Sequence, residues 1–246
     1  MDPLTIAAIA ALMLVAATLY SSVGHAGASA YLAIMALFAL PPDVMRPTAL
    51  VLNIIVSSIA TVRYARTGNF DRTLFWPFAV TAVPAAFLAG GIAVSPELYK
   101  PLLGAVLLFS ALRLLWPKPI RALGVVHPPV LPLALTIGAG VGVLSGIVGV
   151  GGGIFLSPII LFLGWAAPRV TSGSVAAFIL LVSSAGLAGN LSSIGKLPPE
   201  LPWFALAVVV GGLLGTWLGT RRLPPQGIVT ALGVVELIAA YKLLFP

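Results

Sequence analysis

Charged side chains are too scarce in this chain to cover a surface that faces water. The 246 residues include 13 lysines and arginines and 6 aspartates and glutamates, so that 8% of the residues are charged and 60% are hydrophobic. A soluble domain carries roughly 25% charged residues. Lipid must therefore be the solvent for most of the chain, where a spanning segment has to satisfy its own backbone polar groups.

Apolar runs separated by proline, glycine and charge divide the chain into ten segments. The first five lie at 4–22, 28–40, 48–65, 74–94 and 98–116, and the second five at 131–148, 154–165, 171–191, 201–219 and 227–245. A helix needs about 20 residues to cross a membrane, so segments 28–40 and 154–165 are too short to cross. We predict an all-α polytopic membrane protein whose halves each contain a broken or re-entrant helix pair and three full spans.

The two sets of segments resemble copies of each other. The matches keep one order along the chain: Val23-Gly24 with Val148-Gly149, Gly27 with Gly152, Arg46 with Arg169, Ser57-Ser58 with Ser183-Ser184, Trp76 with Trp203, and Gly104 with Gly233. Internal repeats of this kind are typical of transporters. We predict a first membrane repeat at 1–118, a cytoplasmic linker at 119–129 and a second membrane repeat at 130–246.

The distribution of basic residues predicts the orientation of these repeats. Five segments is an odd number, so the second copy would enter the membrane from the opposite side. With the N-terminus outside, nine lysines and arginines fall inside, namely Arg63, Arg66, Arg72, Arg113, Lys118, Arg121, Arg169, Arg221 and Arg222, and four fall outside, namely Arg46, Lys100, Lys196 and Lys242. The positive-inside rule then favours an inverted repeat in the inner membrane of the cell, with both termini outside. Asp2 precedes the first apolar run and no lysine or arginine does, so we expect no cleaved signal peptide.

Glycine-rich breaks precede both short segments. They run from Ser21 to Gly27 and from Ser145 to Gly153. Glycine lets the backbone approach a ligand, and a helix that begins after such a break presents free N–H groups and a positive dipole end to an anion. Close helix packing is the alternative explanation, and it fits two further series of small residues: Gly138, Gly142 and Gly146, and Gly211, Gly215 and Gly219.

Hydroxyl and amide side chains near the breaks would complete an anion site. The predicted substrate-binding residues are Ser21, Ser22, Gly24, His25, Gly27, Asn53, Ser57, Ser145, Gly149, Gly151, Gly152, Gly153 and Ser183. A serine inside a membrane helix often only bonds a carbonyl one turn back, and that alternative stays open for each of them.

Two titratable residues are candidates for proton coupling. His25 lies inside the first break, and Glu236 is an acid in the middle of a long apolar run, where a charge is costly. Pairing with Arg113 or Lys242, or exposure to a wet cavity, is the alternative for Glu236. Arg46 and Arg169 are expected to be interfacial anchors, with anion vestibules as the alternative.

The composition also excludes several classes of function. The chain has no cysteine and two histidines, and it lacks a zinc-protease motif, so we predict no metal, no cofactor and no enzymatic activity. The glycine strings are not followed by the acidic residue of a dinucleotide site. The net charge of +7 is explained by membrane topology, so we predict no nucleic-acid partner.

Three motifs resemble the TauE/SafE sulfite exporter family, also called TSUP. They begin at Ser22 (SVGHAGAS), at Gly142 (GVLSGIVGVGGGIFLSP) and at Arg169 (RVTSGS), and the resemblance spans nearly the whole chain. It implies membrane transport of sulfite, sulfoacetate or other organosulfonates. We therefore expect an ion- or proton-coupled secondary transporter that works by alternating access, with a passive anion channel as the alternative. A homodimer is compatible with the sequence.

Overall fold

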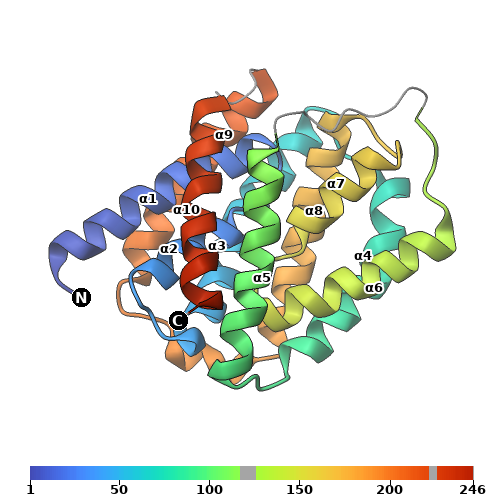
Figure 1. The fold of residues 1–246 in the computed structure, drawn as a ribbon. Coiled ribbons are helices and arrows are strands. Elements are labelled where there is room, and N and C mark those ends of the chain that lie inside the picture. Colours follow the sequence, from blue (N-terminus) through green and yellow to red (C-terminus); the bar gives the residue numbers. More distant parts are fainter. Residues whose placement is uncertain (117–125, 222–225, 246) are drawn as a thin grey trace.

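The structure is a bundle of helices, shown in Figure 1. It is a computed structural model that describes residues 1–116, 126–221 and 226–245. The first five helices are α1 (Pro3–Ser22), α2 (Ala28–Leu37), α3 (Pro42–Arg66), α4 (Arg72–Gly90) and α5 (Pro96–Leu115). The others are α6 (Leu131–Val148), α7 (Gly153–Phe162), α8 (Pro168–Ala188), the 3₁₀ helix η1 (Leu191–Lys196), α9 (Leu201–Arg221) and α10 (Gln226–Leu244). Most of the expected linker at 119–129 lies outside the described residues, so the predicted repeat boundaries stay predictions.

Seven helices of the described part are long and apolar enough to cross a membrane: α1, α3, α4, α5, α6, α8 and α9. Large apolar side chains cover their outer surfaces, and Leu88 and Trp203 are 71% and 61% exposed. Such exposure suits a lipid-facing surface. The short helices α2 and α7 have 10 residues each, as the lengths of their apolar segments predicted. The all-helical polytopic fold is thereby confirmed.

The two halves pack against each other through pairs of helices that contain one helix from each half. α1 packs on α9, α6 packs on α4, and the pairs α3–α8 and α5–α10 likewise take one helix from each half. Glycines bring the first two pairs into backbone contact: a Cβ added at Gly142 would lie 2.4 Å from the Ala82 carbonyl oxygen, and one at Gly215 would lie 2.0 Å from that of Thr18. The packing explanation of these two small-residue series is therefore correct. The inversion of the repeats across a membrane stays a prediction.

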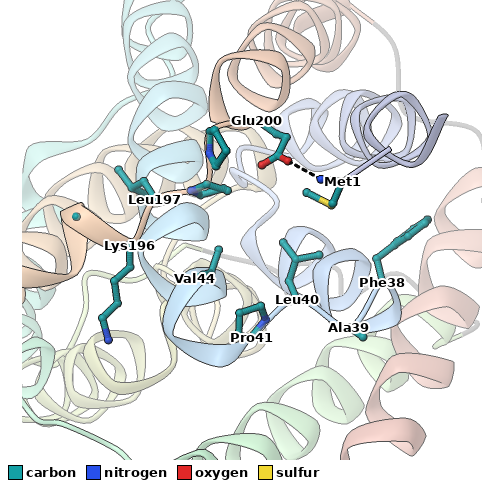
Figure 2. Close-up of a pocket in the computed structure, with 12 residues that line it drawn as sticks. Met1, Phe38, Ala39, Leu40, Pro41, Val44, Lys196, Leu197 and Glu200 are labelled. Carbon is teal, nitrogen blue, oxygen red and sulfur yellow. Dashed lines mark hydrogen bonds and ion pairs between the residues drawn. The ribbon is translucent and has the colours of Figure 1, made fainter. Parts of the chain in front are cut away.

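Each half begins with a helical hairpin. Met1, before α1, lines the same pocket of about 420 Å³ as Phe38, after α2, and Figure 2 shows both beside the ion pair of the Met1 amine with Glu200. In the second half, the amide of His127, before α6, donates to the Gly164 carbonyl, after α7, at 3.1 Å. α2 and α7 therefore return toward the face from which α1 and α6 set out.

Both ends of the chain lie at one face of the bundle. The Lys242 ammonium, near the end of α10, donates to the Leu37 carbonyl at 3.0 Å, and Leu37 ends the hairpin whose first helix begins beside Met1. Figure 1 shows both termini in the lower half of the view. This arrangement is the one that the positive-inside argument requires, although the side of the membrane on which that face lies stays a prediction.

Candidate functional site

Both hairpins turn through left-handed glycines. Gly24 and Gly27 have φ values of +80° and +105°, and Gly149 and Gly152 have φ values of +89° and +75°. Only glycine adopts this conformation without strain. Gly27 and Gly152 are the residues that precede α2 and α7, and neither helix has a side-chain cap at its start. Both short helices therefore begin with amide groups that no capping side chain satisfies.

The first break reaches the beginning of α7. His25 Nε2 lies 2.7 Å from the Ser157 hydroxyl, one turn into α7. A Cβ built on Gly153, the first residue of α7, would lie 3.2 Å from His25 Cδ2. The two breaks, 125 residues apart in the sequence, are thus brought into contact.

The second break passes between α3 and α8. A Cβ on Gly151 would lie 2.5 Å from Asn53 Nδ2 and 2.9 Å from the Ser183 hydroxyl oxygen, so only glycine fits there. Asn53 Nδ2 also donates to Ser183 Oγ at 3.3 Å. Gly152 lies next to Ser145, whose Cβ is 3.7 Å from the added Cβ position. Four of the predicted residues, Asn53, Ser145, Gly151 and Ser183, are therefore assembled at one place.

Two polar atoms at this place lack partners. Asn53, Ser145 and Ser183 are fully buried, and both Asn53 Oδ1 and Ser145 Oγ have no hydrogen bond within the described residues. A buried polar group without a partner costs about 1–3 kcal/mol. A ligand that bonded these groups would remove that cost. No acidic side chain is among the nearest neighbours of a Cβ added at Gly151, Gly152 or Gly153, so the immediate surroundings suit a neutral or negative ligand.

Other predicted site residues contact backbone or neighbouring helices instead. The Ser22 hydroxyl donates to the Leu19 carbonyl at 2.6 Å, and the Ser57 hydroxyl donates to the Asn53 carbonyl. Ser21 Oγ lies 3.4 Å from the Gly212 carbonyl oxygen on α9. The added Cβ contacts show Gly24 against Ser172, Gly27 against the ring of Tyr31, and Gly149 against Arg46. None of these other predicted site residues is among the nearest neighbours of Gly151.

A second buried polar cluster surrounds Glu236. The Tyr20 hydroxyl donates to Glu236 Oε1, and the Ser29 hydroxyl donates to Tyr20 at 2.9 Å. Ser110 Oγ lies 3.4 Å from both the Tyr20 and the Ser29 hydroxyl oxygens. Glu236 forms no ion pair with Arg113 or Lys242 in the described structure: Tyr20 donates to one carboxylate oxygen, and the Lys242 ammonium donates to the Ala36 and Leu37 carbonyls instead.

Sequence reasoning missed Tyr20, Ser29, Ser110 and also Ser157, which bonds His25. Ser29, Ser110 and Ser157 are single polar residues in apolar runs, and Tyr20 directly precedes Ser21 and Ser22. The role of each arises from contacts with other helices. The spacing of the sequence contains no signal that would have found them.

Arg46 and Arg169 occupy matching sequence positions but different environments. Arg46 is 7% exposed, and its Nη2 donates to the carbonyls of Gly90 at 2.6 Å and of Gly146. It therefore satisfies the C-terminal ends of α4 and α6, where a cation is favourable. Arg169 is exposed. The expectation of an interfacial anchor is wrong for Arg46, because a guanidinium can be buried where several carbonyls converge on it.

Metal ligands do not cluster in the described part of the chain: no group of three or more histidine, aspartate or glutamate side chains could hold an ion there.

The family of the chain follows from comparison with known proteins. The Sulfite exporter TauE/SafE family matches residues 9–243. The chain belongs to the TauE/SafE family.

One TauE/SafE relative comes from Sinorhizobium fredii and is named Probable membrane transporter protein y4hK. It is 37% identical over 234 residues, which cover 94% of this chain and 95% of the relative. No solved structure matches the chain. The chain is thus a multi-pass membrane protein of a TauE/SafE transporter family and not an enzyme, as its resemblance and composition predicted.

Proposed function

We propose that this TauE/SafE protein is a secondary transporter of small sulfur-containing anions, such as sulfite, sulfoacetate or another organosulfonate. The observation that carries the proposal is the second break, where Gly151 lies between Asn53 and Ser183 and where the Ser145 hydroxyl has no partner among the described residues. The family name, Sulfite exporter TauE/SafE, supports the substrate class.

The chemistry of the break suits an oxyanion. A sulfite or sulfonate group has three oxygens that each accept hydrogen bonds, and hydrogen bonds to a charged acceptor are about twice as strong as neutral ones. The amides at the start of α7 and the hydroxyls of Ser145 and Ser183 are the donors, and the positive end of α7 adds a favourable field. The anion is held without a lysine or arginine, so it can leave again.

The transport cycle is alternating access, driven by an ion or proton gradient. Gly149, Gly151 and Gly152, all at positive φ, leave the α6–α7 turn with little side-chain packing to hold it, which suits a turn that must change conformation. The sequence has no phosphate-binding loop, and this supports a gradient as the energy source. The transporter lies in the inner membrane with both termini outside.

Flux into proteoliposomes tests the proposal. Purified protein is reconstituted, and uptake of radiolabelled sulfite, sulfoacetate and sulfate is measured against protein-free liposomes. We expect saturable uptake of sulfite or sulfoacetate that is accelerated by the same unlabelled anion inside the liposomes. A passive channel, the alternative, would give flux without that acceleration and without accumulation against a gradient. The absence of flux for every one of these anions would contradict the proposal.

A further inference from the structure

The buried carboxylate of Glu236 lies where four helices meet. Tyr20 belongs to the last turn of α1, Ser29 to the first turn of α2, Ser110 to α5 and Glu236 to α10. Their side chains are at most 3% exposed. The cluster therefore connects the two arms of the first hairpin to the helices that hold it.

The hydrogen bonds in this cluster leave the carboxylate short of donors. The Ser29 hydroxyl donates to Tyr20 and the Tyr20 hydroxyl donates to Glu236 Oε1, while Oε2 is buried with no partner in the described part of the chain. An ionised carboxylate buried with so few donors is unfavourable by several kcal/mol. A proton on Oε2 removes the charge, so the observed arrangement fits the neutral acid.

Among the described residues, no cation forms an ion pair with Glu236. The charged and titratable groups on the elements around it are His25 and Tyr20 from the first hairpin, Tyr31 from α2, Arg113 from α5 and Lys242 from α10, together with Glu97, Tyr99 and Lys100 in the first two turns of α5 and Tyr241 beside Lys242. The Tyr31 hydroxyl donates to the Ala26 carbonyl, and the Lys242 ammonium donates to the Ala36 and Leu37 carbonyls. The His25 ring centroid lies 6.1 Å from that of Tyr20, and the ring bonds Ser157. Arg113 forms no ion pair with Glu236 in the described structure.

α10 holds α2 at both of its ends. Lys242 bonds the last carbonyls of α2, and the Glu236–Tyr20 pair takes the Ser29 hydroxyl in its first turn. A change of charge on Glu236 therefore alters the hydrogen bonds at the end of α1 and at the beginning of α2. At the spacing that relates Gly104 to Gly233, the corresponding position of the first half is Leu107, which cannot ionise. The carboxylate is thus present in one copy only.

We propose that Glu236, positioned by Tyr20, binds the proton that drives transport. This inference rests on the proposed function. A proton from water adds to the free carboxylate oxygen, Glu236 Oε2, to give the neutral acid, and the first hairpin closes around it. When the proton leaves for the opposite face, the carboxylate regains its charge, and the buried charge is relieved by opening the junction of α1 and α2 to water.

Glu236→Gln is the decisive variant, because it keeps the shape of the neutral acid and cannot release a proton. Sulfoacetate is the transport probe, because both of its acidic groups stay ionised near neutral pH. We measure exchange of radiolabelled sulfoacetate at equal pH and its accumulation under an imposed pH gradient. The ratio of accumulation to exchange should fall about tenfold in Glu236→Gln. Glu97→Gln, an exposed carboxylate on α5, is the control and should keep the wild-type ratio.

A second measurement does not depend on transport. The folded protein holds a proton that the unfolded chain releases at neutral pH, so its thermal unfolding midpoint in detergent should fall as the pH rises, and this slope should be lost in Glu236→Gln. Tyr20→Phe, which keeps the ring and removes the donor, should make Glu236 harder to ionise and move the loss of stability to higher pH. If Glu236→Gln does not fold, the pH dependence of the unfolding midpoint in Tyr20→Phe alone tests the proposal.

The possible results separate the two proposals. An absence of sulfoacetate and sulfite flux together with a Glu236-dependent slope contradicts the proposed function and leaves a proton site. Two results overturn the proton site and leave an anion transporter. One is wild-type flux that does not depend on the pH gradient. The other is an accumulation-to-exchange ratio and a slope of the unfolding midpoint against pH that neither variant changes.

Discussion

The two broken hairpins share a backbone design and differ in what fills it. In the first, nine of the ten residues of α2 are buried, and the break contains His25 and Ala26. In the second, five of the ten residues of α7 are buried, Phe162 is 68% exposed, and the break contains three consecutive glycines that begin at Gly151. The first hairpin is closely packed, whereas the second is less buried and has an unpaired hydroxyl donor at Ser145 and an unpaired amide acceptor at Asn53.

Polar side chains make the same distinction. The Tyr64 hydroxyl donates to the Ser22 carbonyl at 2.9 Å and the Tyr99 hydroxyl donates to the Val148 carbonyl at 2.9 Å, so each break has one tyrosine on the end of its first helix. Beyond that shared feature, the Tyr20–Glu236 pair lies at the first break, while Asn53 Oδ1 and Ser145 Oγ at the second have no partner among the described residues. Duplication thus supplied the geometry twice, and we infer that proton binding takes place at the first hairpin, through Glu236 of the second half, and anion binding at the second hairpin.

Filling the second break should have the largest effect. Gly151→Ala places a Cβ 2.5 Å from Asn53 Nδ2 and forces alanine to φ +73°, so we expect uptake to fall about a hundredfold. Gly68→Ala is the matched control, because Gly68 has the same φ of +73° and nothing lies within 4 Å of the added Cβ. Both variants are compared in the proteoliposome flux assay. Wild-type uptake by Gly151→Ala would remove the second break as the anion site.

Arg46 and Arg169, at matching positions of the two halves, should contribute differently to the free energy of unfolding. Arg46→Gln leaves carbonyls at the ends of α4 and α6 without their shared donor, so we expect the free energy of unfolding to fall by about 2 kcal/mol. Arg169→Gln, at the matching exposed position, should change it by less than about 0.5 kcal/mol. Denaturant unfolding in detergent measures both. Equal losses for the two variants would show that the halves are held in the same way.

Paired serines test which hydroxyls meet the anion. Ser183→Ala removes a hydroxyl that lies beside Gly151, and we expect about a tenfold rise in the anion concentration for half-maximal uptake. Ser184→Ala is the neighbouring control, because the Ser184 hydroxyl donates to the Leu180 carbonyl at 2.8 Å. Ser57→Ala, in the matching position of the first half, should have a smaller effect than Ser183→Ala. A larger effect at Ser57 would assign the anion to the first break.

Local signals in the sequence were sufficient for the positions of the helices. Proline, glycine strings and segment length predicted short helices at 28–40 and 154–165, and the structure has them at Ala28–Leu37 and Gly153–Phe162. The third segment was expected from residue 48 and begins at Pro42, because apolarity alone excluded Asp43 and Arg46 from the helix. A proline at the first position and a buried guanidinium extend it.

The candidate site was only partly predictable, for a physical reason. A run of glycines in the sequence indicates backbone at positive φ, and an acid in an apolar run indicates a charge that is costly to bury. Gly151, Gly152 and Glu236 could therefore be predicted as site residues. The partners of these residues come from helices far away in sequence. Tyr20 meets Glu236 across 216 positions and Asn53 meets Ser183 across 130, and no periodicity in one segment reports such contacts.

The beginnings of the two hairpins give the smallest expected effect. Asp2 caps α1 by accepting from the Thr5 amide at 2.9 Å, whereas α6 begins after Val130 with no side-chain cap. Pro132 has no amide hydrogen, so Val130→Asp would accept from the Leu133 amide, three residues on, as Asp2 does from Thr5. We expect it to stabilise the protein by about 0.5–1 kcal/mol, measured by denaturant unfolding, with Val130→Asn as the uncharged control.

The pH dependence of stability tests whether Val130→Asp acts as a helix cap in the way that Asp2 does. The Thr5 hydroxyl, helped by the Thr5 amide, lowers the pKa of Asp2 below its usual value. A carboxyl group with a lowered pKa contributes stability above its unfolded pKa and loses it as the pH falls through the folded one. The gain from Val130→Asp should therefore fade in acid, while that from Val130→Asn should not. A gain that is independent of pH would mean that the new side chain acts by packing, and that the uncapped start of the second hairpin was never a weakness.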